Sequence, residues 1–489
     1  MELKHRVVSG FLWTATEKFG SLAVHLCAML MLLRLLEPAD FGLVSMLAVF
    51  TAVANSIVDS GFSQALIQKK TVSRVDYDSV FWLNLGIAAL LYLLMWALCK
   101  PIAAFYDTPE LVRIAPWIFC IIPLSALGLI QTTVLMRGMN FRAISKANFA
   151  AAITAAVTAV VMAWFGFGVW ALVCQTVALY AIRTAALWLL NDWRPSLRFS
   201  WASVRGLFGL GSKLFAVGMI TQFFNNVSLM IVGRFYNATQ LGLYSQPLKL
   251  RNASAEAISL PVQNVTFPAF STLQDDDAKM KSAVRQVISV QSLVLFPAML
   301  GLIAVADEGF LIAGKEKWLA SVPYFKVLCL SALFMPLSNI SLNLLKAKGE
   351  GGLLLRTEIV KKAFGFAAIL YGATVSVMAV TWAFFAWTAF EMVVNLRFAS
   401  RLTGYRLREQ LTDTLPYVAM AAAVWGAAEG VGLLMPDASA YLSLTVKVVA
   451  GGAVYLALCL LFKPAAWVEA KRIVSEKFAR LRGGSRKSG

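Results

Sequence analysis

Charged residues are scarce in this chain of 489 residues, where they make up 14% of the sequence while hydrophobic residues make up 59%. Soluble domains carry roughly 25% charged residues, so the composition excludes an ordinary soluble fold and indicates a chain built for a lipid bilayer. Acidic residues are scarcer than basic ones, at 26 against 44, which gives a formal net charge of +18. The basic residues lie between apolar runs and not along one face with interleaved aromatics, so we expect no nucleic-acid partner.

Residues that bind metals or carry out catalysis are few as well. His5 and His25 are the only histidines, and the six cysteines stand singly without a C-x-x-C pair. A zinc site needs such ligands at close spacing, so we expect no metal site and no cofactor. Long polar loops are also missing, although a membrane glycosyltransferase or polymerase would need one to carry its catalytic carboxylates. We therefore expect a protein that is not an enzyme, and we assign no catalytic residue.

Long apolar runs dominate the chain. A helix needs about 20 apolar residues to cross a bilayer. This criterion predicts about fourteen transmembrane helices, so the expected fold class is an all-α polytopic membrane protein. The expected spans are 8–34, 41–67, 79–99, 111–136, 146–165, 168–190, 206–234, 240–268, 284–305, 320–345, 356–374, 376–398, 411–434 and 441–462.

A repeated motif divides the expected spans into two lobes. The sequence RLLEPADFGLVS at 34–45 returns as RFYNATQLGLYS at 234–245, between two apolar runs in both places. Each lobe holds six spans, so both lobes enter the membrane from the same side and we expect a parallel repeat. The expected domains are an N-lobe at 1–195, a C-lobe at 196–405, an additional helix pair at 406–463 and a basic amphipathic cytoplasmic tail at 464–489.

The distribution of basic residues predicts the orientation in the membrane. Lysine and arginine gather in one alternating set of loops and in the tail, whereas the opposite loops carry few of them. Basic loops of membrane proteins stay in the cytoplasm. We therefore expect both the N-terminus and the C-terminus to be cytoplasmic.

Polar side chains follow one face of four expected spans. In 240–268 the residues Lys249, Asn252 and Glu256 recur at steps of three or four, which places them on one helical face. Similar faces occur in 8–34, 41–67 and 206–234, and these four spans belong to the two copies of the repeat. A polar face inside a membrane must look into water or protein. We expect a water-filled cleft between the lobes, although for any single residue a charge pair between helices is an equally good explanation.

The charge of this cleft predicts its ligand. Basic side chains outnumber acidic ones, and phosphate is bound by lysine as a point charge and by arginine as a fork. An anionic headgroup is therefore the expected cargo, although helical geometry points Arg251 away from the Lys249 face. The expected substrate-binding residues are Lys18, Lys213, Lys249 and Arg251, with Arg34 and Arg234 at the outer rim. The expected coupling or polar cavity residues are Glu17, Asp59, Glu256, Asn252, His25 and Asn225.

Residues 41–70, FGLVSMLAVFTAVANSIVDSGFSQALIQKK, resemble the second span of polysaccharide flippases of the Wzx type, especially the colanic-acid and O-antigen branch. The motifs FGL at 41–43, DSGF at 59–62 and LGLYS at 241–245 are typical of that family. The resemblance implies the fold of the multidrug/oligosaccharidyl-lipid/polysaccharide (MOP) exporter superfamily, which the multidrug exporters called MATE share. It also implies a flippase of the bacterial inner membrane that carries undecaprenyl-diphosphate-linked oligosaccharides to the periplasmic leaflet by alternating access.

The resemblance implies partners too, and some alternatives stay open. A proton or a sodium ion is the expected coupling ion, and contacts with polysaccharide polymerase and chain-length machinery are expected in this family. A cation-coupled multidrug exporter would favour a cleft rich in carboxylates, whereas this one is rich in cations. A lipid II flippase is the second alternative, and the residues separate it poorly from the main interpretation.

Overall fold

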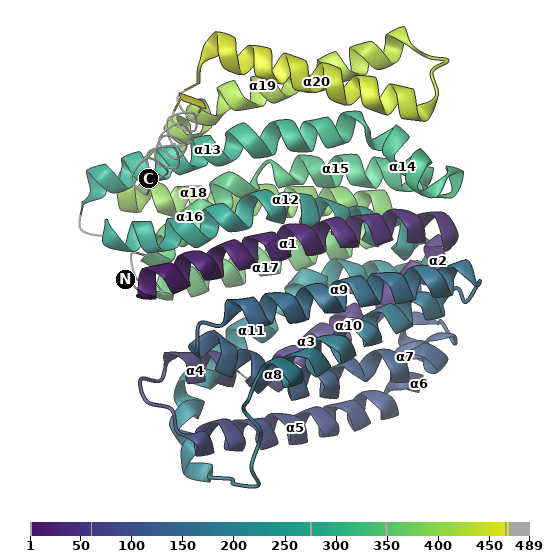
Figure 1. The fold of residues 1–489 in the computed structure, drawn as a ribbon. Helices are drawn as coiled ribbons and strands as arrows, with labels where there is room; N and C mark the ends of the chain where they lie inside the picture. Colours follow the sequence, from purple (N-terminus) through teal and green to yellow (C-terminus); the bar gives the residue numbers. More distant parts are fainter. Residues whose placement is uncertain (1, 60, 274–275, 348–350, 465–466, 469–489) are drawn as a thin grey trace, which may run out of the picture. The chain divides into compact units, whose positions relative to one another are not determined.

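The computed structural model describes residues 2–59, 61–273, 276–347, 351–464 and 467–468, and it is helical without a strand in these residues (Figure 1). The all-α fold class predicted from the sequence is therefore confirmed. The chain divides into two compact units, Met1–Ser245 and Gln246–Gly489. Residues 469–489 of the expected amphipathic tail lie outside the described part.

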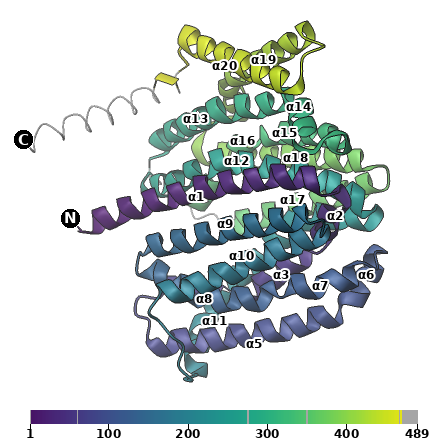
Figure 2. The same ribbon diagram turned by 45° about the vertical axis from the view of Figure 1, so that its right-hand side comes forward.

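In the residues that the structure describes, the N-terminal unit contains eleven helices and the beginning of a twelfth. They are α1 (Glu2–Leu35), α2 (Pro38–Met46), α3 (Ala48–Asp59), α4 (Phe62–Gln68), α5 (Arg74–Ala97), α6 (Cys99–Tyr106), α7 (Leu111–Phe119), α8 (Ile121–Arg137), α9 (Phe141–Trp164), α10 (Val169–Leu190), α11 (Trp201–Phe235) and α12 (Ala238–Thr272). Helix α9 packs against both α1 and α10, and the three run side by side in both views (Figures 1 and 2).

The C-terminal unit begins within α12 and continues with the rest of the chain. Its further helices are α13 (Asp277–Ala304), α14 (Ala306–Gly314), the 3-10 helix η1 (Glu316–Ser321), α15 (Val322–Ala332), α16 (Met335–Ala347), α17 (Gly351–Ala373), α18 (Val377–Thr403), α19 (Leu407–Leu434) and α20 (Ala440–Phe462). The pair α19 and α20, which the sequence sets apart from the repeat, packs on this unit through α13 (Figure 2).

Every expected span coincides with one helix or with a few consecutive short ones. In the described residues, nine stretches are long and apolar enough to cross a membrane, and a tenth results if α15 and α16, bent by 42°, form one span. The polytopic membrane class is therefore confirmed, whereas the count of fourteen and the four-domain division stay predictions.

Short polar residues determine where several helices begin. Ser73 precedes α5, and its Oγ accepts a hydrogen bond from the Asp76 backbone N–H while the Asp76 carboxylate accepts one from the Ser73 N–H. Such a capping box satisfies backbone donors that the first turn leaves free. The hydroxyl of Ser376 caps α18 in a similar way. The second span is broken before α4 at Gly61, whose φ of 68° is a conformation that glycine adopts without strain.

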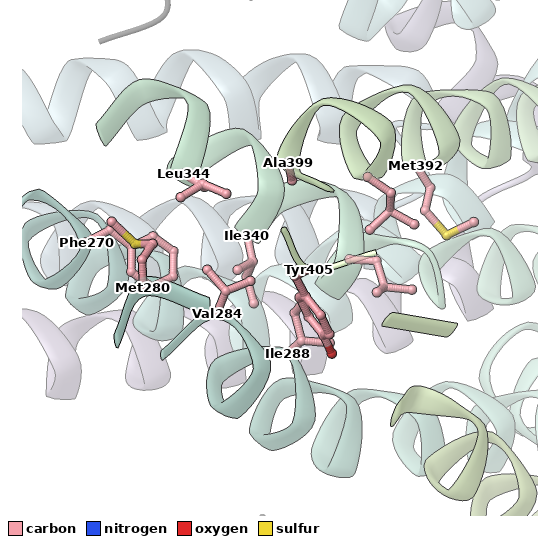
Figure 3. Packing of buried hydrophobic residues seen from close by; sticks show 11 residues of the cluster. Phe270, Met280, Val284, Ile288, Ile340, Leu344, Met392, Ala399 and Tyr405 are labelled. Atoms are coloured by element: carbon pink, nitrogen blue, oxygen red, sulfur yellow. The ribbon is translucent and has the colours of Figure 1, made fainter. Parts of the chain in front are cut away.

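Buried apolar side chains hold each unit together. In the N-terminal unit, α4, α5, α8 and α11 enclose a cluster that includes Phe62, Phe81 and Ile130. In the C-terminal unit, α12, α13, α16 and α18 meet around Val284 and Ile340, with the ring of Tyr405 beside them (Figure 3). Closely packed side chains give each helix a defined neighbour. The packing of the helices therefore fixes the direction in which their polar side chains point.

Candidate functional site

The two copies of the repeated motif meet directly within the N-terminal unit. Arg34 lies in the last turn of α1 and Arg234 in the last turn of α11, and in both copies a short turn and a new helix follow. The Oγ of Ser45 donates a hydrogen bond to the Oγ of Ser245 over 3.1 Å, and both side chains are buried. Residues that the sequence shows as equivalent are therefore partners in one contact.

Glycines allow the two backbones to approach this closely. A Cβ atom added to Gly42 would lie 1.7 Å from the carbonyl oxygen of Ala238, and one added to Gly242 would lie 1.8 Å from that of Pro38. Neither position has room for any side chain, so glycine is required on both sides by close packing and not by its dihedral angles. The contact is reciprocal, because each copy places its glycine on the first residue of the other copy's helix.

The two arginines of the motif remain exposed. The guanidinium of Arg234 lies over the ring of Phe105, at 5.6 Å from the ring centroid, which is a cation–π contact. Arg34 is exposed at the equivalent end of α1. Their role at the rim of a cleft stays a prediction.

The expected polar face of α1 consists of half-buried and exposed side chains. Glu17 is half-buried and accepts a hydrogen bond from the Oγ of Ser21 at 3.4 Å, whereas Lys18 and His25 are exposed. Asn148 of α9 lies close to the Glu17 carboxylate. The structure thus places the α1 carboxylate beside α9, a neighbour that the sequence did not indicate.

On α12 the charged residues divide between two faces. Lys249 and Glu256 are exposed, Asn252 is half-buried, and Arg251 is only 6% exposed. Helical geometry predicts this separation, because residues two positions apart point in nearly opposite directions. Lys249 and Glu256 therefore lie on an exposed face of α12, and Arg251 lies on a buried face.

Arg251 makes its contacts inside the C-terminal unit. Its guanidinium donates to the Leu328 carbonyl at 3.2 Å, to the Ser331 Oγ at 3.1 Å and to the Asn252 Oδ1 at 2.8 Å. It also lies over the ring of Phe384, 5.7 Å from the centroid. Its donors therefore join α12 to α15, and a role in substrate binding stays a prediction for this residue.

Three further expected residues occupy different positions. Asp59 is the last residue of α3 and is half-buried, and Asn225 is exposed on α11. Lys213 belongs to α11, but its side chain lies outside the part of the chain that the structure describes. The cleft that these residues are expected to line stays a prediction.

The structure also reveals buried charges that the sequence reasoning missed. Lys361 lies within α17, where it pairs with Glu358 and donates to the Asn395 Oδ1 at 2.9 Å. The Asn395 amide in turn donates to the Ser338 Oγ at 2.8 Å. Lys361 falls inside the expected span 356–374, which corresponds to α17 (Gly351–Ala373). The sequence did contain a signal for this site, because a charged residue inside an expected membrane span is unusual.

A second missed group lies between α14, α19 and α20. The Nζ of Lys447 is 2.6 Å from the Glu308 Oε1 and 3.8 Å from the Glu429 Oε2, and it donates to the Ala304 carbonyl at 3.1 Å. Lys447 is 6% exposed. These contacts fasten the C-terminal helix pair to the rest of its unit.

A cavity of about 680 Å³ lies in the same unit, between α12, α13, α19 and α20. Aliphatic side chains such as Ile258, Leu293 and Val424 form most of its wall, with Lys447 and Tyr455 among the few polar contributors. Such a wall accommodates hydrocarbon and not a charged or sugar headgroup, because it offers too few hydrogen-bond partners.

Comparison with known proteins gives relatives along most of the chain. The lipopolysaccharide biosynthesis protein WzxC of Escherichia coli K12 is 26% identical over 381 residues, which cover 76% of this chain and 76% of that protein. The succinoglycan biosynthesis transport protein ExoT of Rhizobium meliloti 1021 is 26% identical over 366 residues, which cover 74% of this chain and 73% of that protein. The teichuronic acid biosynthesis protein TuaB of Bacillus subtilis 168 is 25% identical over 470 residues, which cover 94% of this chain and 95% of that protein.

Solved structures share the fold at low sequence identity. The lipid II flippase MurJ in an inward closed conformation has a TM-score of 0.70 at 13% identity, covering 93% of this chain and 98% of that chain. An inward-facing MATE family transporter of the MOP superfamily has a TM-score of 0.61 at 13% identity, covering 80% of this chain and 95% of that chain. The expected MOP fold is therefore confirmed. Residues 31–323 match the model of the family described as polysaccharide biosynthesis protein, and the chain belongs to this family.

Proposed function

We propose that the protein is a flippase that carries undecaprenyl-diphosphate-linked oligosaccharide repeat units from the cytoplasmic to the periplasmic leaflet of the bacterial inner membrane. The observation that carries the proposal is membership of the polysaccharide biosynthesis family together with relatives named for the biosynthesis or transport of surface polysaccharides. The fold shared with a lipid II flippase supports the same kind of cargo, a sugar on a lipid carrier. The product serves the synthesis of O-antigen, capsule or exopolysaccharide.

The transport step follows from the charge of the cargo. A diphosphate with sugars cannot cross hydrocarbon unaided, because removing charges from water is costly. The cations of the polar faces, Lys18, Lys213 and Lys249, bind the diphosphate, with Arg34 and Arg234 at the rim. The prenyl tail stays in the bilayer. Each negative charge moved outward gains about 2.3 kcal/mol per 100 mV of membrane potential.

Alternating access requires the cleft to open to one side at a time, and a coupled ion can drive the return step. Glu17, Asp59 and Glu256 are the carboxylates available for a proton or a sodium ion. Both termini lie in the cytoplasm in this proposal. Polymerase and chain-length machinery receive the repeat unit on the periplasmic side.

Complementation in cells tests this function. Deletion of the chromosomal copy is expected to abolish the surface glycan and to accumulate its lipid-linked precursor on the cytoplasmic face. A plasmid with the wild-type gene restores export, whereas Lys213→Ala and Lys249→Ala do not, although both variants still insert in the membrane. Wild-type surface glycan with both variants would contradict the assignment of the cleft.

Two further assays distinguish the alternatives. Expression in cells depleted of their own lipid II flippase is expected to leave their growth defect unchanged. Rescue of growth would assign lipid II as the cargo. An unchanged glycan in the deletion strain, combined with a new sensitivity to cationic drugs, would favour the multidrug exporter.

A further inference from the structure

Arg183 is an arginine inside a membrane span, and the cleft described above does not include it. It lies on α10 seven residues before Leu190, where that helix ends. At 1.5 Å per residue this places it about 10 Å along the helix from that end. The side chain is half-buried. A charge at such depth is costly and marks a functional site unless a countercharge neutralises it.

The contacts of Arg183 hold one edge of its guanidinium and leave the other edge open. Its Nε donates to the Oδ1 of Asn148 on α9 at 2.9 Å. Asn148 lies seven residues after Phe141, at the start of its own helix, and the antiparallel hairpin places both residues at the same depth. Among the residues that the structure describes, Arg183 has no ion pair, and its two terminal nitrogens have no hydrogen-bond acceptor.

A carboxylate of α1 completes the group without neutralising it. Glu17 of α1 lies close to Asn148 and Arg183, and Lys18 is the next residue of the same helix. The group therefore contains two cations, Lys18 and Arg183, and one carboxylate. The helices that carry it are tightly packed, because a Cβ atom on Gly20 of α1 would lie 2.8 Å from the ring of Phe149 on α9. Helices α1, α9 and α10 lie side by side (Figures 1 and 2).

We propose that Arg183 and Lys18 form a phosphate-binding site in the N-terminal unit, in which Asn148 is the positioning residue. The bond from Nε to Asn148 fixes the plane of the guanidinium, so that its two terminal nitrogens present a fork to two oxygens of one phosphate. The exposed ammonium of Lys18 supplies a second, mobile charge. The identification of the ligand as a lipid-linked diphosphate rests on the proposed function, whereas the anion chemistry rests on the residues themselves.

A purely structural role for Arg183, as a tie between α9 and α10, makes a different prediction. In that case, loss of the tie lowers stability, and the affinity for anions does not change. Arg183→Gln separates the two roles, because glutamine can still donate to Asn148 but carries no charge. Arg183→Lys keeps the charge and loses the fork.

The test is calorimetric titration of the purified full-length protein in detergent with farnesyl diphosphate, with farnesol as the uncharged control. Hydrogen bonds to charged groups are worth about 1.5–3 kcal/mol, so Arg183→Gln is expected to weaken diphosphate binding by at least about tenfold. Arg183→Lys is expected to fall between this variant and wild type. Arg113→Ala, which removes an exposed arginine of α7, is the matched control and binds as wild type.

The unfolding midpoint of each variant completes the experiment. Wild-type affinity in Arg183→Gln overturns the proposal, and so does a loss of affinity that only follows a loss of stability. If Arg183→Gln fails to fold, Lys18→Gln tests the same site, because it alters an exposed side chain. It is expected to weaken binding severalfold, and unchanged binding in both Lys18→Gln and Arg183→Lys overturns the site.

Export in cells separates this proposal from the proposed function. A protein that binds farnesyl diphosphate through Arg183 but does not restore surface glycan contradicts the transport function and supports the site. A protein that restores surface glycan equally well with Arg183→Gln supports the transport function and contradicts the site.

Discussion

Lys361 shows how one buried charge can hold three helices together. It is 1% exposed on α17, and its ammonium meets Glu358 of the same helix and Asn395 of α18, which in turn bonds Ser338 of α16. A buried ion pair contributes little net stability compared with apolar residues, but removal of one partner leaves the other charge uncompensated. The three helices therefore depend on Lys361 more strongly than on an exposed ion pair.

Lys361→Met is expected to lower the free energy of unfolding by about 3 kcal/mol, because Glu358, Asn395 and their neighbours lose a buried donor. The double variant Lys361→Met/Glu358→Gln recovers part of this loss. The matched control is Lys326→Met, which removes a more exposed pair with Asp307 and costs less than about 1 kcal/mol. Unfolding midpoints in a denaturant series measure all three, and equal losses at positions 361 and 326 would contradict the interpretation.

At the scale of elements, the crossing of the two repeated motifs is a tightly constrained contact within the N-terminal unit. Backbone carbonyls occupy the places where Cβ atoms of residues 42 and 242 would be, and a hydrogen bond joins Ser45 to Ser245. The helix α12 then continues past Ser245 into the C-terminal unit without a break.

Gly42→Ala and Gly242→Ala are each expected to destabilise the protein by at least about 2 kcal/mol, because the new methyl group must displace a backbone carbonyl. Gly86→Ala is the matched control: nothing lies within 4 Å of its Cβ position in the middle of α5. It is expected to stabilise the helix by about 0.5–1 kcal/mol. Thermal unfolding of the purified variants checks this, and the same shift at all three positions would refute the close crossing.

Cross-linking tests the same contact in the membrane. The two hydroxyl oxygens of Ser45 and Ser245 are 3.1 Å apart, a separation that two cysteine sulfurs can close to a bond. In a background without the six native cysteines, Ser45→Cys/Ser245→Cys is expected to form a disulfide under mild oxidation, whereas either single variant forms none. Proteolysis between the two positions followed by gel analysis detects it. Two separate fragments after oxidation would show that the motifs do not meet.

At the scale of the whole molecule, loop charge sets the direction of insertion. Basic loops resist transfer across the inner membrane, so a net charge of +18 that gathers in alternate loops and in the tail is a strong signal. Green fluorescent protein fused after Gly489 is expected to fluoresce, and alkaline phosphatase fused there is expected to be inactive. Phosphatase inserted after Asp107, between α6 and α7, is the matched control and is expected to be active. Reversed activities would invert the topology and the direction of transport.

The sequence alone determined the all-α membrane class and the family, because hydropathy and local motifs depend on neighbours along the chain. It also predicted that Lys249 and Arg251 point in opposite directions, since helical periodicity is local too. It did not reveal which side chains meet across helices. The bond of Arg183 to Asn148 spans 35 positions, and that of Ser45 to Ser245 spans 200. Only the tertiary structure decided these pairs, because the choice of partner depends on how whole helices pack and not on the residues beside each one.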